Sequence, residues 1–203
     1  MVVGARKAGA GREIASAITR QGHRADFLEI DVSDDANVIA AAREFAKQWD
    51  HLDVLVNNAA IKLVNDTSVL ENPDAVLRET LETNTLGPLR VTRAFAALLG
   101  NSAAPRVVNL SSGGGQLADG AAGWAPAYCI SKTALNMVTA QLAVALPRFA
   151  INSMCPGWVK TDMGGAEAPR TVQQGADTIV WLAEAAPQNL TGKFLRDREI
   201  IPW

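Results

Sequence analysis

The chain has 203 residues, of which 48% are hydrophobic and 20% charged, and this length and composition indicate one soluble globular domain over residues 1–203. The formal net charge of −2 does not favour nucleic acid or an anionic membrane as a partner, and no apolar run is long enough to cross a bilayer. The N-terminus lacks a secretory signal pattern, the two cysteines indicate buried thiols in a reducing cytoplasm, and the two histidines have no neighbours that predict a metal site.

Strand-like and helix-like segments alternate along the chain, which predicts an α/β fold with a parallel sheet. In the first part we expect strands at 2–5, 25–30 and 52–56. A helix is expected after Gly9 and Gly11, running to about residue 20, and a second one over 37–49. Ser33 or Asp34 is suited to cap the second helix.

The second part continues the alternation. Pro73 opens a long helix to about residue 99, which Gly87 and Pro88 should bend. Strands are expected at 106–110, 150–154 and 193–195, and helices at 127–146 and 172–185. The loop 113–125, rich in glycine and alanine around Trp124, would border a substrate pocket, and the connection 158–170 would act as a lid.

A phenol and an ammonium lie four residues apart near the start of the helix at 127–146. This spacing places Tyr128 and Lys132 on one helix face. A Lys ammonium about 4 Å from a phenol, at an effective dielectric near 20, favours phenolate by roughly 4 kcal/mol, or about 3 pK units. Tyr128 would then suit general acid–base chemistry, with Ser112 at a strand end to hold a carbonyl. Taken alone, the pair also fits a helix-start aromatic beside a surface charge.

Several short motifs together resemble the short-chain dehydrogenase/reductase family, in the family's order and over nearly the whole chain. The resemblance implies a Rossmann-like, doubly wound parallel sheet and an NAD(P)-dependent oxidoreductase acting on a carbonyl or an alcohol. The C-terminal half resembles the carbonyl-reductase branch. The matching residues are Asn57 to Ala60, Asn84, Ser111, Ser112, Tyr128 to Lys132 and Pro156 to Thr161.

The resemblance also implies a role for each matching residue. The implied catalytic set, in which Asn84 holds a water of the proton relay, is Asn84, Ser112, Tyr128 and Lys132. The implied cofactor contacts run from adenine through ribose to the carboxamide and pyrophosphate, and they are Asp31, Val32, Asn57, Ala59, Ala60, Tyr128, Lys132, Pro156, Gly157, Val159 and Thr161. The family usually has Gly where this chain has Ala60.

The N-terminal segment allows two alignments. Gly4, Gly9 and Gly11 could form the glycine-rich turn that holds a pyrophosphate, with Asp31 on the ribose hydroxyl. The spacing is too short, however, because one βαβ unit needs about 30 residues. In the favoured alignment residues 2–5 are the family's second strand. The first strand, glycine turn and first helix are then absent from this chain, and the sheet should be incomplete at its N-terminal side.

The favoured alignment gives Arg6 a possible role in cofactor choice. It places Arg6 just past the second strand, where an acid would select NAD. A guanidinium suits a 2′-phosphate instead, so NADPH is expected rather than NAD. The alternative is a plain surface arginine.

Two functions follow from these patterns. The first is an NADPH-dependent carbonyl reductase for a small-molecule substrate, as a monomer or a homo-oligomer. The second is an N-terminally incomplete binding protein that keeps the site residues but holds the cofactor poorly. Under either, we expect a cleft in the sheet between residues 2–5 and 52–56, or residues 1–33 displaced or paired differently.

Overall fold

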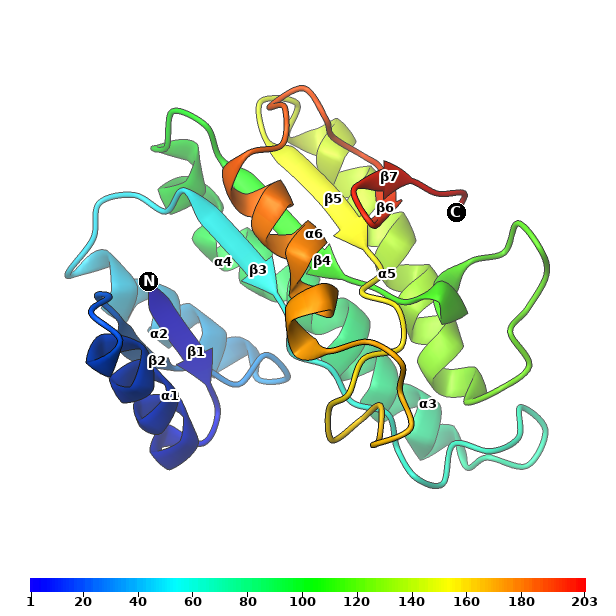
Figure 1. Ribbon diagram of the computed structural model, residues 1–203. Helices are drawn as coiled ribbons and strands as arrows, with labels where there is room; N and C mark the ends of the chain where they lie inside the picture. The colour runs from blue at the N-terminus through cyan, green and yellow to red at the C-terminus, as the bar shows by residue number, and fades with distance from the viewer.

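The computed structural model describes all 203 residues and has the expected α/β architecture (Figure 1). The strands are β1 (Val2–Ala5), β2 (Asp26–Glu29), β3 (Val54–Asn57), β4 (Arg106–Leu110), β5 (Ala150–Met154), β6 (Phe194–Arg196) and β7 (Glu199–Ile200). The α-helices are α1 (Ala8–Arg20), α2 (Asp35–Ala46), α3 (Asp74–Leu81), α4 (Gly87–Gly100), α5 (Pro126–Ala145) and α6 (Val172–Glu184). A π-helical segment, Glu82–Leu86, joins α3 to α4, and a 3₁₀ turn, Gly113–Gly115, follows β4.

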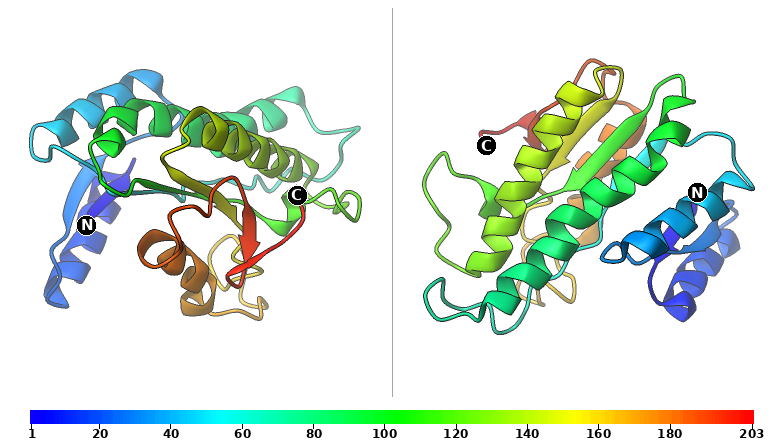
Figure 2. Two further views of the ribbon diagram at one scale, coloured as in Figure 1. Left: turned by 90° about the horizontal axis from the view of Figure 1, so that it is seen from above. Right: turned by 180° about the vertical axis from the view of Figure 1, so that it is seen from behind.

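The helices cover both faces of the sheet layer, as in a doubly wound fold. Helices α2, α4 and α5 lie on one face, and α1 and α6 lie on the other (Figure 2). All strand pairs are parallel except β6 with β7. The expected fold class is therefore confirmed.

The sheet is split in two. Strands β1 and β2 form one sheet, and β3 to β7 form another, in the order β3-β4-β5-β6-β7. In Figure 1, β1 and β3 run in the same direction on the two sides of the split. The cleft expected from the sequence is present, and residues 2–5 pair with residues 26–29 rather than with β3. This pairing supports the favoured alignment of the N-terminal segment.

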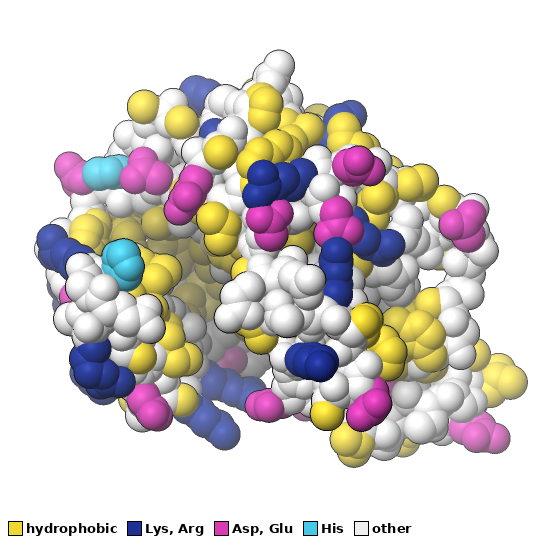
Figure 3. Space-filling model, viewed as in Figure 1, with side chains coloured by type: hydrophobic (Ala, Val, Ile, Leu, Met, Phe, Trp, Pro, Cys, Tyr) yellow, Lys and Arg dark blue, Asp and Glu magenta, His cyan; other side chains and the backbone are white.

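The split leaves β3 poorly covered, although a strand inside a parallel sheet is normally buried on both faces. Val56 is 38% exposed, whereas Val108, its partner on β4, is 1% exposed. Residues 1–46 form an N-terminal unit on one side of the split. Figure 3 shows a hollow with largely hydrophobic walls between this N-terminal unit and the rest of the molecule.

The helix layer continues across the split. Val38 and Phe45 on α2 pack in one core with Phe95 and Leu99 on α4, and the rings of Phe45 and Phe95 meet edge to face at 5.5 Å. Arg90 on α4 adds a polar link, because its Nη1 donates to the Val32 carbonyl oxygen at 2.7 Å. The same guanidinium pairs with Asp35 and Glu82.

Two local expectations need correction. Gly9 and Gly11 were expected to precede the first helix, but they lie inside its first turn. Gly11 serves packing, because a Cβ there would lie 2.2 Å from the Phe27 ring. Strand β7 was not predicted, because it follows a tight turn in which neither positive-φ residue, Asp197 or Arg198, is a glycine.

The predicted bend of the helix at 73–99 is a π-helical segment. The Gly87 N–H donates to the Glu82 carbonyl, five residues back, and Pro88 has no N–H to donate. Gly87 also allows a close approach of the N-terminal unit, since a Cβ there would lie 2.9 Å from Val32 Cγ2.

Candidate active site

Helix α5 presents the Tyr–Lys pair on its buried face. The helix begins at Pro126, and Tyr128 and Lys132 are 8% and 2% exposed. The Lys132 ammonium lies 5.6 Å from the centroid of the Tyr128 ring and donates to the Leu110 carbonyl oxygen at 2.8 Å. The pair is therefore a packed unit at the carboxyl end of β4, not a surface feature.

Ser112 completes this unit two residues after β4. Its backbone is extended, and its hydroxyl accepts the Gly114 N–H at 3.1 Å. The same side chain lies near enough to the Tyr128 phenol to act on its pKa. Gly115 allows the 3₁₀ turn to lie directly on α5, because a Cβ there would lie 2.8 Å from the Lys132 backbone. The structure thus brings Ser112, Tyr128 and Lys132 together, as the sequence predicted.

The pKa of Tyr128 departs from the expected direction. Burial raises it above its ordinary value, and the hydrogen bond from Ser112 offsets only part of that rise. Lys132 was expected to lower it, but this ammonium lies over the ring and bonds a carbonyl of β4. The cation itself is destabilised, since burial lowers the pKa of Lys132 to about 8.

Asn84 lies in the π-helical segment and is fully buried. Its Oδ1 accepts the Ile61 N–H at 2.8 Å, and its Nδ2 donates to the Ile61 carbonyl at 2.8 Å and to Ser131 Oγ at 3.0 Å. The side chain thereby joins the loop after β3 to α5. Both Nδ2 protons have protein partners, so the water-holding role of Asn84 stays a prediction.

Asn57 turns its side chain into the core rather than toward the sheet edge. Its Nδ2 donates to Asn109 Oδ1 on β4 at 2.8 Å, and Asn109 Nδ2 donates to Thr139 Oγ1 on α5 at 2.9 Å. Thr139 in turn bonds Ser153 Oγ on β5 at 2.8 Å. This buried polar ladder spans three strands, and it uses the Asn57 amide nitrogen, which also donates to Thr92 Oγ1 at 3.2 Å. The cofactor contact of Asn57 stays a prediction.

The N-terminal unit holds the residues expected at the adenosine end. Arg6 and Asp31 follow the paired strands β1 and β2. Hydrogen bonds from Ser33 hold the pKa of Asp31 below its ordinary value, and the nearby Arg6 guanidinium adds to this effect. Val32 is half-buried, and its carbonyl is taken by Arg90.

The remaining expected cofactor contacts follow β3 and β5. Ala59 is exposed and Ala60 is half-buried. Gly157 has φ +76°, and a Cβ there would lie 2.7 Å from Arg170. That arginine donates to the Pro156 carbonyl at 2.8 Å.

The connection 158–170 begins and ends at one paired point. Val159 forms a β-bridge with Arg170, and a Cβ on Gly175 would lie 2.6 Å from Val159 Cγ2. Thr161 is exposed, and its hydroxyl accepts the Gly164 N–H at 3.1 Å. The lid role of this connection stays a prediction.

Comparison with known proteins agrees with this arrangement. The profile of the family described as short chain dehydrogenase matches residues 1–171. The chain belongs to the short-chain dehydrogenase family. As a member, it is 32% identical to (+)-neomenthol dehydrogenase from Arabidopsis thaliana, over 77% of this chain and 72% of that protein.

The resemblance to carbonyl reductases within the short-chain dehydrogenases is also confirmed. The chain is 26% identical to carbonyl reductase [NADPH] 1 from Sus scrofa, over 100% of this chain and 85% of that protein. The solved structure of the carbonyl reductase Sniffer of D. melanogaster superposes with a TM-score of 0.89 at 28% identity. That superposition covers 100% of this chain and 87% of the solved one.

Sequence reasoning missed two residues beside the unit of Ser112, Tyr128 and Lys132 in this short-chain dehydrogenase. Cys155, expected only as a small buried residue, accepts the Gly113 N–H on Sγ at 3.1 Å and lies 3.4 Å from Arg196 Nη2. Asp66, in the loop after β3, bonds the start of α5. Each contact joins residues more than 40 positions apart, so no local pattern signals it.

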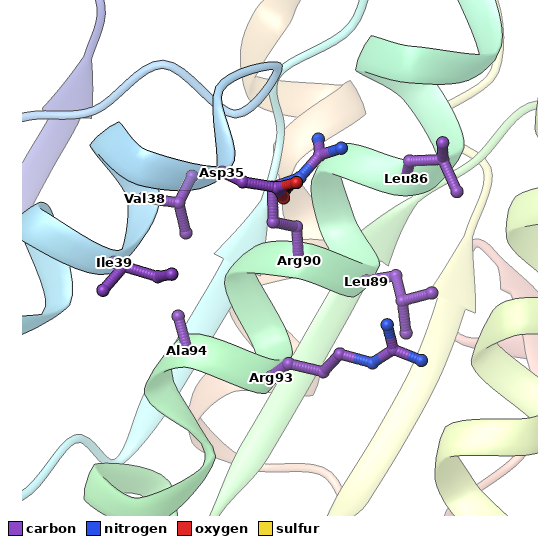
Figure 4. Close-up of a pocket in the computed structure, with 8 residues that line it drawn as sticks. All are labelled: Asp35, Val38, Ile39, Leu86, Leu89, Arg90, Arg93 and Ala94. Carbon is purple, nitrogen blue, oxygen red and sulfur yellow. Dashed lines mark hydrogen bonds and ion pairs between the residues drawn. The ribbon is translucent and has the colours of Figure 1, made fainter.

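Other features of the molecule lie apart from this site. A groove of about 430 Å³ between α2 and α4 is lined by none of the predicted site residues, and in Figure 4 Arg90 points toward Asp35 there. The structure gathers no group of three or more His, Cys, Asp or Glu side chains placed to hold a metal ion. No helix is both long and apolar enough to cross a membrane.

Proposed function

We propose that this short-chain dehydrogenase reduces a carbonyl to an alcohol, or catalyses the reverse reaction, with NADPH as the cofactor. The observation that carries the proposal is the packed unit of Ser112, Tyr128 and Lys132 at the carboxyl end of β4. A phenol beside a serine hydroxyl can give its proton to a substrate oxygen that the serine holds. The free thiols Cys129 and Cys155 suit a cytoplasmic setting.

The proposal assigns a role to each residue. NADPH, when bound, supplies the hydride. Tyr128 donates the proton to the carbonyl oxygen, and Ser112 orients that oxygen. Lys132 fixes the end of β4 through its hydrogen bond to the Leu110 carbonyl, and it binds the nicotinamide ribose. Asn84 ties α5 to the loop after β3 and completes the proton relay.

The residues fit NADPH at its two ends. Arg6 is exposed beside Asp31 and offers a guanidinium to a 2′-phosphate, which favours NADPH over NADH. The Sus scrofa relative, a carbonyl reductase [NADPH], supports the same choice. The nicotinamide end would lie on Tyr128, Lys132 and Pro156.

The residues proposed for the two ends of NADPH lie on separate sheets. This observation favours a second candidate function, a binding protein without turnover. No described strand joins β1 to β3, so no glycine-rich turn lies between the two ends to hold the pyrophosphate. We therefore expect this 203-residue chain to bind NADPH weakly. The second candidate is a binding protein of the same family that keeps the catalytic unit without turnover.

Tyr128→Phe tests the proposal, read by NADPH fluorescence titration and by carbonyl-dependent NADPH oxidation. Losing the acid should lower turnover by about 10²–10⁴-fold and leave NADPH affinity nearly unchanged. Near-wild-type turnover of the variant would exclude Tyr128 as the acid. A wild-type chain that shows no measurable NADPH binding and turns over no carbonyl would favour the binding protein.

A further inference from the structure

Helix α5 cannot cap its own N-terminus. The residue at its N-cap is Ala125, which has no side-chain oxygen and has φ +39°. The next residue, Pro126, has no N–H. The first free donors are therefore the N–H groups of Ala127 and Tyr128, which a capping side chain would normally accept.

Asp66 accepts both of these donors from a loop about 60 residues earlier in the chain. Its Oδ1 lies 3.0 Å from the Ala127 nitrogen, and its Oδ2 lies 2.9 Å from the Tyr128 nitrogen. Asn72 Nδ2 also donates to Oδ1 at 2.7 Å. The residue is only 6% exposed, so this carboxylate is a buried cap whose charge also suits the positive end of the helix.

The loop that carries Asp66 is itself braced. Asn72 Oδ1 accepts the N–H groups of Thr67 and Ser68, both at 3.1 Å. The carboxylate is thus held on one side by the loop and on the other by the backbone of the proposed catalytic tyrosine. A shift of Asp66 would move the Tyr128 backbone directly.

We infer that Asp66 is a positioning residue for Tyr128: it fixes the first turn of α5, so that the phenol meets Ser112. This inference rests on the proposed function. An amide cannot replace the carboxylate, because its NH₂ would face one of the two N–H donors. Stacking of Trp124 on the phenol ring, with centroids 5.8 Å apart, closes the other side of Tyr128.

The sequence offers a direct probe, because Tyr128 is its only tyrosine. Ultraviolet titration of phenolate formation therefore reports Tyr128 alone, whether or not turnover is measurable. We compare Asp66→Asn with Asn72→Ala, which loosens the brace but keeps the carboxylate. Asp34→Asn is the matched control, since Asp34 caps α2 by accepting the Asn37 N–H at 3.0 Å.

In Asp66→Asn the phenol pKa should fall toward its ordinary value, because a loosened first turn admits water to the ring. Turnover should fall by up to about a hundredfold with a smaller change in KM. Asn72→Ala should shift the same pKa in the same direction by less, which separates positioning from loss of charge. The other titratable groups near the phenol, Lys132, Cys129 and Cys155, are unchanged in both variants.

Asp34→Asn should leave both readouts unchanged. Unchanged phenol pKa and turnover in Asp66→Asn would overturn the inference, and so would a pKa change confined to Asp66→Asn. If Asp66→Asn does not fold, Asn72→Ala alone decides the question by the same readouts. If Tyr128→Phe keeps full turnover, the proposed function fails, and the phenol titration still tests the capping role.

Discussion

Strands β1 and β4 have similar sequences but very different surroundings. Both are short parallel strands rich in valine. Val107 and Val108 on β4 have a strand on each side and are at most 1% exposed, whereas Val2 and Val3 on β1 have a strand on one side and are only half-buried. Burial of a strand is therefore a property of its neighbours more than of its residues.

The same difference separates the two parts of the proposed site. The unit of Ser112, Tyr128 and Lys132 lies where the sheet is continuous, and its phenol and ammonium are buried. The adenosine-end residues lie beside the split, and Arg6 there is exposed. The proposed chemistry thus rests on the region with a continuous sheet, and the proposed cofactor affinity depends on the region beside the split.

The largest expected effect comes from filling the split. We expect that a strand, glycine-rich turn and helix from a carbonyl reductase, placed before Met1, will pair with β1 and β3. Covering the apolar walls of the split should raise the free energy of unfolding, because each 100 Å² of apolar surface buried contributes about 2.5 kcal/mol. Urea unfolding measures this gain, and NADPH titration should show tighter binding.

A graft with proline in the middle of the added strand is the control, because it cannot complete both ladders. Equal stability of the two grafts would mean that the added strand does not enter the split.

The next effect concerns Lys132, in the region where the sheet is continuous. Burial lowers the pKa of Lys132 to about 8, from an ordinary value of 10.5. Between these values the unfolded chain binds more protons than the folded one, so stability should rise with pH. The gain from pH 8 to 10 should be roughly 2–3 kcal/mol. Above about pH 10 the raised pKa of Tyr128 reverses the trend, because the unfolded phenol ionises first.

Lys132→Met should remove this rise of stability with pH, whereas the control Lys62→Met, at an exposed position, should keep it. Urea unfolding across this pH range measures both variants. A rise that persists in Lys132→Met would assign it to another group.

The smallest effect concerns Arg6, in the region beside the split. Arg6→Ala should lower the preference of the protein for NADPH over NADH by about ten- to a hundredfold, because a charge-assisted contact contributes roughly 1.5–3 kcal/mol. Parallel titrations with the two cofactors measure the ratio, with Arg12→Ala as a control on α1. Equal affinity of the unmutated chain for both cofactors would make Arg6 a surface residue.

The order of elements was predictable from sequence because hydrophobic periodicity is local. A cap at Ser33 or Asp34, a helix from about residue 127 and a bend near Gly87 follow from nearby residues. The structure confirms them, with Asp34 as the cap and α5 beginning one residue earlier, at Pro126. The split was predictable only through the family resemblance.

Long-range contacts were not predictable. Nothing beside Asn57 indicates that its amide turns inward to Asn109, and nothing beside Asp66 indicates a helix 60 residues later. The direction of the Tyr128 pKa was wrong for the same reason. Spacing placed the charges near each other, but burial depends on the whole fold.

The helix layer that crosses the split has a mechanical consequence. No backbone hydrogen bond joins residues 1–46 to the chain beyond residue 51. The seam of α2 against α4, with the Arg90 link, can therefore act as a hinge, since rotation about it breaks no backbone ladder. The two ends of the proposed cofactor site lie on opposite sides of this hinge. A ligand that bridges them would restrict the rotation, so binding and rigidity of the whole molecule are coupled.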